Sequence, residues 1–268
     1  QNLEPHRATK FRAISARANY LAQDRSEIQF SVKELCRAMS CPKEDDWNKL
    51  KRLSRYLVGK ERCTILFQYQ APLEGVVVWT DSDFASTNPV RHSINQEIQE
   101  EHFDMINGIN LEGEASCRRS TSGGLVVLGE HLIKSWSSTQ KVTALSSGEA
   151  EYYAIVKGAC QGMGIRSMLQ DFHIDKAVQN HIEIKEDSSA AKGIASRRGL
   201  EKLKHVDIKE LWIQEKVTLS DLKITKVPGT INLADALTKY CDTHVTNHHV
   251  ASTHQTISSL KHPLTPSI

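Results

Sequence analysis

The stretch Gly75-Val76-Val77-Val78-Trp79-Thr80-Asp81-Ser82-Asp83 decides the fold. Its continuous apolar run is typical of a β-strand covered on both faces, and it ends in two acids. Downstream, residues 124–128 and 132–136 are two further apolar runs, joined by Gly129-Glu130-His131. This spacing predicts a hairpin that extends the same sheet.

Towards the C-terminus, helical and strand patterns alternate. A long apolar stripe predicts a helix over about residues 148–172. Residues 182–185 and 222–227 alternate as strands, and helices are expected at about 188–195, 206–216 and from 232 to 238 onward. The order βββαβα(α)βα predicts an α/β fold, with a mixed sheet and helices packed on its faces.

Residues 8–70 are predicted to be mainly helical, because apolar side chains recur there at three- and four-residue spacing, although the pattern changes to β from residue 63, at Thr64-Ile65-Leu66-Phe67. The second of these helices is expected at about 46–58. Residues 43–62 hold seven basic and four acidic side chains. This mild excess is as consistent with contact to a phosphate backbone as with a solvated helix face.

Composition excludes several classes of protein. The 268 residues include 34 Lys and Arg against 32 Asp and Glu, so the net charge of +2 gives no whole-chain signal for a polyanionic partner. The six cysteines form no CxxC pair, which favours a reducing, intracellular setting. Apolar runs fall far short of the ~18 to 20 residues that cross a bilayer, and no secretion signal opens the chain. We therefore expect a protein that neither spans a membrane nor is secreted. The first residue is Gln rather than Met, which suggests a piece of a longer protein.

Two segments are predicted to lie outside the regular fold. Residues 86–117 show no sustained periodicity and carry six acids against one Arg between 91 and 114. We interpret them as a surface insertion, because ordered connections seldom exceed ~12 to 15 residues. Residues 241–268 also lose periodicity, and their Cys and His spacing matches no standard zinc site. A disordered tail is expected there.

Four acids fall at the ends of predicted elements: Asp81, Glu151, Asp187 and Asp235. Such carboxylates can converge on one sheet edge, and together they require cations such as Mg²⁺. Each has a structural alternative. Asp83 competes with Asp81, since strand side chains alternate in direction. Asp187 could cap a helix and Asp235 could interact with a helix dipole. Glu149, by contrast, is assigned to a capping box with Ser146.

Several linked motifs resemble the RNase H domain of copia-type LTR retrotransposon Pol polyproteins. They are Thr80-Asp81-Ser82-Asp83-Phe84-Ala85, Arg119-Ser120-Thr121-Ser122-Gly123-Gly124, Ala144-Leu145-Ser146-Ser147-Gly148-Glu149-Ala150-Glu151-Tyr152, Glu186-Asp187-Ser188-Ser189-Ala190-Ala191, Lys204-His205-Val206-Asp207-Ile208 and Asn232-Leu233-Ala234-Asp235-Ala236-Leu237-Thr238-Lys239. Upstream, Tyr20–Ile28, Leu35–Met39 and Trp47–Leu57 resemble the thumb or connection region that ends the reverse transcriptase of the same polyprotein.

The resemblance implies a five-stranded mixed sheet with flanking helices over residues 71–240, preceded by a helical reverse-transcriptase end over 1–70. It implies a ribonuclease H that hydrolyses the RNA strand of RNA:DNA hybrids during reverse transcription. Asp81, Glu151, Asp187 and Asp235 would hold two Mg²⁺ ions, with Mn²⁺ as a substitute. The rest of the Pol polyprotein would be a partner, in a cytoplasmic particle or the nucleus. The polymerase motif Tyr-x-Asp-Asp is absent, so this chain should not polymerise DNA alone.

Segment 192–209 is the expected contact with the hybrid, held through phosphates and the 2′-OH. The candidate contacts are Lys192, Arg197, Arg198, Lys202, Lys204 and His205. A solvated loop is the alternative, and packing or phosphate contact suits His205 at least as well as catalysis.

Two other functions compete with the nuclease. A catalytically inactive remnant would only bind nucleic acid or support a polymerase. An integrase-type nuclease fits poorly, because the last acid is Asp235 rather than a helical Glu.

Overall fold

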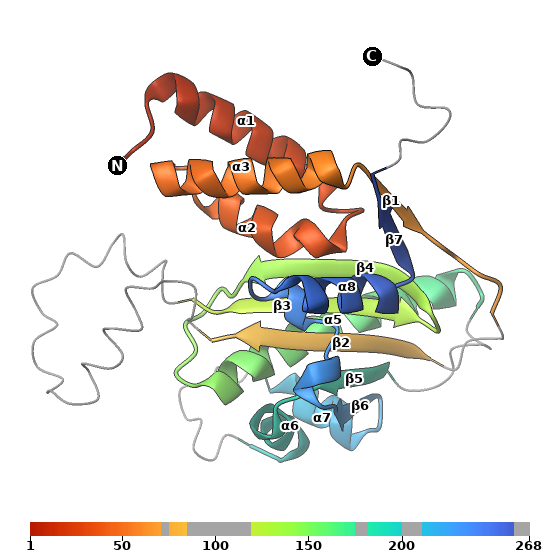
Figure 1. Cartoon of the computed structure of the whole chain (residues 1–268). Helices are drawn as coiled ribbons and strands as arrows, with labels where there is room; N and C mark the ends of the chain where they lie inside the picture. Colours follow the sequence, from red (N-terminus) through yellow and green to blue (C-terminus); the bar gives the residue numbers. More distant parts are fainter. Residues whose placement is uncertain (71–74, 85–118, 175–181, 200–210, 260–268) are drawn as a thin grey trace, which may run out of the picture.

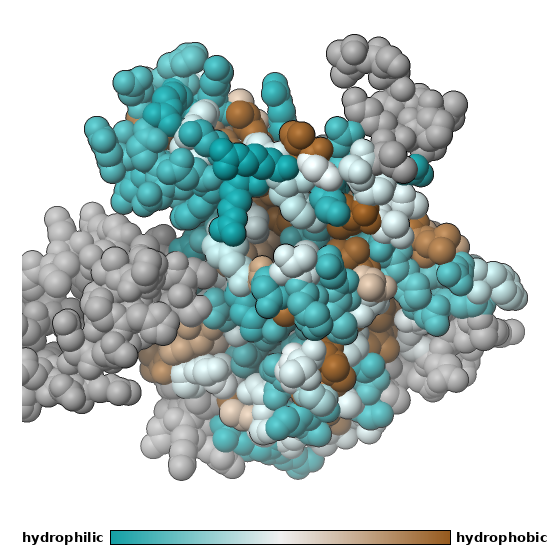
Figure 2. Space-filling view, viewed as in Figure 1, coloured by the Kyte–Doolittle hydropathy of each residue, from teal (hydrophilic) through white to brown (hydrophobic). Residues whose placement is uncertain are grey.

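A computed structural model of the chain describes residues 1–70, 75–84, 119–174, 182–199 and 211–259. A twisted sheet forms its centre, with helix α5 on one face and α8 on the other, while α1, α2 and α3 lie beyond the edge strand β4 (Figure 1). Hydrophilic side chains gather over α1 and α3 on the face seen in Figure 2. Within these ranges, the helices are too short or too polar to cross a bilayer.

The sheet has five strands in the order β4-β3-β2-β5-β6. Strands β2 (Val76–Asp83), β3 (Thr121–Leu128) and β4 (His131–Thr139) pair antiparallel, while β5 (Ile182–Glu186) and β6 (Leu222–Lys226) run parallel to β2. The predicted mixed sheet with flanking helices is therefore confirmed. Strand β2 lies at the centre, which explains why its sequence is apolar on both faces.

Helix α5 (Ser147–Asp171) packs closely on the sheet because it carries glycines where it crosses the strands. A Cβ on Gly158 would lie 2.4 Å from Thr80 Cγ2, and one on Gly162 would lie 2.9 Å from Ile182 Cγ2. The close approach buries a core between α5 and the strands, which includes Val78, Val126, Tyr152, Ile155 and Ile184. It also fixes the start of α5 against the end of β2 that carries Asp81.

The remaining elements of the sheet layer are short. Helix α6 (Ser189–Ser196) agrees with the prediction, and α7 (Trp212–Thr218) covers the described part of the helix expected at 206–216. The helix predicted from 232 to 238 is wrong: the segment forms only the 3₁₀ turn η6 (Asp235–Leu237), after a similar turn η5 (Gly229–Ile231). The Asn232 side chain accepts a hydrogen bond from Ala234 N at 3.1 Å, which competes with a regular helical turn.

The N-terminal helices are α1 (Pro5–Leu21), the 3₁₀ turn η1 (Ser26–Ile28), α2 (Gln29–Arg37) and α3 (Glu44–Gly59). They share their own core, which includes Phe11, Val32, Leu35 and Leu50. Helix α2 is joined to the sheet, since Lys33 Nζ donates to Thr121 Oγ1 at 2.6 Å and Gln29 Nε2 donates to Ser135 Oγ at 2.9 Å.

The predicted disorder from residue 241 onward is wrong for the described part of that segment. It forms helix α8 (Thr243–Ser252) and strand β7 (Gln255–Ser258), and β7 pairs antiparallel with β1 (Arg62–Ile65). Asp242 caps α8 by accepting from Val245 N at 2.9 Å. The polar residues that suggested disorder are thus used in capping and pairing. Residues 260–268 and the whole of the insertion expected at 86–117 lie outside the described residues.

Candidate metal centre

Three of the four predicted acids meet at one edge of the sheet. Ligand oxygens of Asp81, Glu151 and Asp187 all lie within 4.8 Å of one another. Asp81 lies near the end of β2, Asp187 directly follows the parallel strand β5, and Glu151 lies near the start of α5. Because β2 and β5 are parallel neighbours, their ends bring the two aspartates together, and α5 adds the glutamate. Asp83 is not part of this cluster.

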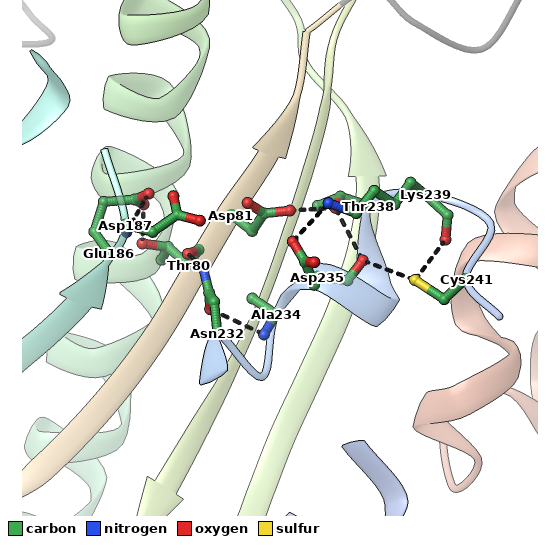
Figure 3. A network of polar contacts seen from close by, with 10 residues as sticks. All are labelled: Thr80, Asp81, Glu186, Asp187, Asn232, Ala234, Asp235, Thr238, Lys239 and Cys241. Atoms are coloured by element: carbon green, nitrogen blue, oxygen red, sulfur yellow. Dashed lines mark hydrogen bonds and ion pairs between the residues drawn. The ribbon is translucent and has the colours of Figure 1, made fainter. Parts of the chain in front are cut away.

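The fourth acid, Asp235, lies beside Asp81 but outside the group of three. Its Oδ1 accepts from Lys239 Nζ at 2.8 Å. Thr238 joins the two aspartates, because its hydroxyl contacts both Asp81 Oδ2 and the Asp235 carbonyl (Figure 3). Asp187 and Asp235 also line one cavity of about 390 Å³, together with residues that include Asn232, Lys239, His244 and His248.

The carboxyl groups disfavour one another's charge. Burial and the charge of Asp235 raise the pKa of Asp81 to about 7, and burial and the neighbouring Glu186 raise the pKa of Glu151 to about 11. Glu151 Oε2 is buried, and no described residue hydrogen-bonds to it. Crowded oxygen ligands with one unsatisfied atom suit a hard divalent cation, which would neutralise the charge that the protein leaves uncompensated. The donor set therefore fits Mg²⁺ or Mn²⁺.

Two structural alternatives for the acids are now decided. Ser188, rather than Asp187, caps α6, since its hydroxyl accepts from Ala191 N at 3.2 Å. Glu149 serves the start of α5 as expected: its amide donates to Ser146 Oγ at 3.2 Å, and its carboxylate accepts from Leu145 N at 2.9 Å. Asp187 is therefore not committed to the helix terminus.

Sequence reasoning did not identify Glu186, which is fully buried on β5 beside the cluster. Its burial raises its pKa well above the usual range. The available signal was the alternation of β5, in which Ile182, Ile184 and Glu186 share the buried face. A charged residue on the apolar face of a strand requires specific partners.

Asn232 was also not identified. It is buried, and its Nδ2 donates to the Thr80 carbonyl at 2.9 Å, which ties the segment carrying Asp235 to strand β2. The side chain thus sets the distance between Asp81 and Asp235. Asn232 is the first residue of the motif at 232–239, but its position alone is equally typical of an ordinary helix cap.

The predicted nucleic-acid contacts are only partly described. Lys192 lies on α6, the helix that starts two residues after Asp187, and Arg197 and Arg198 directly follow the end of this helix. Arg198 is exposed, whereas Lys192 and Arg197 are half-buried. Lys202, Lys204 and His205 lie outside the described residues. Contact with a hybrid stays a prediction for all six.

Comparison with known proteins finds Pol polyproteins of plant transposons among the relatives of this chain. No family model matches the chain. The retrovirus-related Pol polyproteins of transposons RE2 and RE1 from Arabidopsis thaliana are each 28% identical over 232 residues, which is 86% of this chain and 14% of each relative. That of transposon TNT 1-94 from Nicotiana tabacum is 27% identical over 217 residues, 80% of this chain and 14% of the relative.

Among solved structures, LC11-RNase H1 in complex with an RNA/DNA hybrid is 17% identical, with a TM-score of 0.33 over 61% of this chain and 93% of that chain. The fold assignment therefore depends on the strand order of the sheet and not on this similarity. The chain spans about 14% of the length of the Pol relatives. Over most of its own length, the chain is similar to one part of the retrovirus-related Pol polyproteins of these transposons.

Proposed function

We propose that the chain is a ribonuclease H that hydrolyses the RNA strand of RNA:DNA hybrids with the help of divalent cations. One observation carries the proposal: Asp81, Glu151 and Asp187 converge within 4.8 Å at the edge of a mixed sheet. They come from three separate motifs that resemble the RNase H domain of Pol polyproteins. Bringing the buried Asp81 and Glu151 together with the half-buried Asp187 costs free energy, because the carboxylates lose hydration and repel one another.

In this proposal Asp81, Glu151, Asp187 and Asp235 hold two Mg²⁺ ions. When bound, such ions supply charge neutralisation and Lewis acidity for phosphodiester hydrolysis. The protein's own contribution is orientation. The Thr238 hydroxyl fixes one oxygen of Asp81, and Lys239 holds Asp235 through its ammonium group. The unpartnered Oε2 of Glu151 is left available as a ligand.

The substrate would be bound mainly through its phosphates, with the basic side chains at α6 and in the segment after it as contacts. Such binding depends on salt and only weakly on sequence, which suits an enzyme that follows a reverse transcriptase. As part of the proposal, residues 1–70 are the end of that reverse transcriptase, and the activity takes place inside the cell, in a particle or the nucleus.

The test is cleavage of a labelled RNA:DNA duplex by the whole chain in Mg²⁺. We expect cleavage of the RNA strand, complete loss in EDTA, and recovery with Mn²⁺. Asp187→Asn should lower the rate by more than about 100-fold, because loss of a ligand costs more than loss of an outer-shell partner. Asp171→Asn, at an exposed position at the end of α5, is the matched control and should cleave normally.

Two outcomes contradict the proposal in different ways. Cleavage that survives EDTA or Asp187→Asn refutes the metal assignment. Hybrid binding without turnover in either cation, by a chain shown to be folded, selects the inactive remnant that only binds nucleic acid or supports a polymerase.

A further inference from the structure

Glu186 is fully buried, yet both of its carboxylate oxygens are engaged by groups that adjoin the metal centre. Oε1 accepts from Asp187 N at 3.0 Å and from Ser188 N at 3.3 Å. Oε2 accepts from Thr80 Oγ1 at 2.7 Å. These groups lie directly beside the two aspartates of the cluster, as Figure 3 shows for Thr80 and Asp187.

The same contacts belong to a chain of hydrogen bonds across the site. Thr80, held by Glu186 through its hydroxyl, accepts from Asn232 Nδ2 through its carbonyl. Asn232 in turn accepts from Ala234 N, immediately before Asp235. Glu186 therefore lies at one end of a network that connects β5, β2 and the turn that carries Asp235.

We propose that Glu186 is a positioning residue, which aligns Asp81 and Asp187 so that their carboxylates can bind the same cation. Its carboxyl group holds the backbone amides of Asp187 and Ser188 at the end of β5. It also holds the hydroxyl of Thr80, which precedes Asp81 on β2. It acts through its neighbours rather than as a ligand, since it is absent from the cluster of converging oxygens and three donors already use most of its acceptor sites. The expected effect of Glu186 on hybrid cleavage rests on the proposed function. Its expected effect on cation binding can be tested without that function.

Two substitutions separate the hydrogen-bonding role of Glu186 from the effect of its charge. Glu186→Leu keeps the approximate volume but leaves Thr80 Oγ1, Asp187 N and Ser188 N without this acceptor. Glu186→Gln removes the charge and keeps an amide oxygen for the two backbone N–H groups. If hydrogen bonding rather than charge aligns the two aspartates, Glu186→Gln should restore the Mn²⁺ affinity that Glu186→Leu loses.

Strand β5 offers a matched control. Glu183 lies on the same strand but on its other face, and its Oε1 accepts from Thr225 Oγ1 at 2.6 Å. Like Glu186, it therefore accepts a hydrogen bond from a threonine on a neighbouring strand, but this contact lies away from the cluster of acids. Glu183→Leu repeats the substitution without touching Asp81 or Asp187.

The experiment measures Mn²⁺ binding to the whole chain by calorimetry, alongside kcat and KM for hybrid cleavage. We expect Glu186→Leu to weaken Mn²⁺ binding by about 10- to 100-fold, as outer-shell losses do. kcat should fall at saturating hybrid with little change in KM, while Glu186→Gln recovers most of the Mn²⁺ affinity. Glu183→Leu should bind Mn²⁺ as the unmodified chain does.

Thr80→Val provides a second route if Glu186→Leu fails to fold, because it removes one hydroxyl and conserves shape. It should also weaken Mn²⁺ binding, and Thr80→Ser should restore it.

Equal losses of Mn²⁺ affinity in Glu186→Gln and Glu186→Leu would overturn the inference and indicate that Glu186 is a direct ligand. Unchanged Mn²⁺ affinity in Thr80→Val would also overturn it, as would a wild-type chain that binds no Mn²⁺. A chain that binds Mn²⁺ but cleaves no hybrid would refute the nuclease, while the binding series would still test Glu186.

Discussion

His249 makes the stability of this protein depend on pH in a way that can be calculated. The side chain is buried between three segments: its Nδ1 lies 2.8 Å from the Leu233 carbonyl and its Nε2 lies 2.8 Å from Ser26 Oγ. A carbonyl can only accept, so Nδ1 carries the proton and Nε2 accepts from the serine hydroxyl. The neutral ring therefore satisfies both contacts, and a second proton on Nε2 would force the Ser26 hydroxyl to change from donor to acceptor.

Burial lowers the pKa of His249 from its ordinary value of 6.5. Between the lowered pKa and 6.5, the unfolded chain binds more protons than the folded chain, so the free energy of unfolding rises with pH in that window. Above it the contribution is constant, and as the pH falls below about 6.5 stability is lost. At pH 5.5, one unit lower, the loss from this one group is at most about 1.4 kcal/mol.

The assay is urea unfolding followed by tryptophan fluorescence at pH 7.5 and 5.5, for the unmodified chain and for His249→Gln. The variant removes the titrating ring, while the other histidines titrate in both proteins and cancel in the difference. At pH 7.5 the variant should be less stable by about 1 to 3 kcal/mol, because a buried hydrogen-bonding group loses its partner. The gap should narrow by up to about 1.4 kcal/mol at pH 5.5. A gap that stays constant or widens on acidification would refute the reasoning.

Three further substitutions test particular contacts. A Cβ on Gly229 would lie 3.0 Å from Asp187 Oδ2, so Gly229→Ala should weaken Mn²⁺ binding several-fold by calorimetry, with little effect on urea unfolding because the site is exposed. Asp242→Ala removes the cap of α8 and should cost about 1 kcal/mol in urea unfolding; an unchanged midpoint would refute the capping role. Gly158→Ala places a methyl group 2.4 Å from Thr80 Cγ2 and should cost about 1 to 3 kcal/mol by overpacking, which thermal unfolding would detect.

The elements that sequence reasoning predicted well are those whose signal is local. The apolar run at 76–80 indicates a central strand by itself, and the acids at the ends of β2, β5 and the start of α5 follow from the strand order. Their convergence needed only the rule that parallel neighbouring strands end at the same edge. For this reason three of the four predicted acids lie in one cluster, and Asp235 lies beside it.

The elements that it missed depend on contacts between distant segments. Glu186 is the first residue of the motif at 186–191, but nothing in that motif marks its carboxylate as functional. Its importance appears only when Thr80 lies next to it on a neighbouring strand. The segment after 240 is rich in polar residues, so local composition indicated disorder. Its order comes from β1, from Ser26 and from the Leu233 carbonyl, which a pattern along the chain cannot supply.

The pairing of β1 with β7 has a consequence for the order of folding. During synthesis, β1 emerges early, while its partner strand is made only after all five strands of the main sheet have been translated. Loop closure over so long a separation is slow compared with local hairpin formation. Helix α8, which holds the segment of Asp235 through His249, lies directly before β7. A nascent chain should therefore form its main sheet first and place Asp235 beside Asp81 last, so the proposed nuclease activity should appear only after α8 and β7 have been translated.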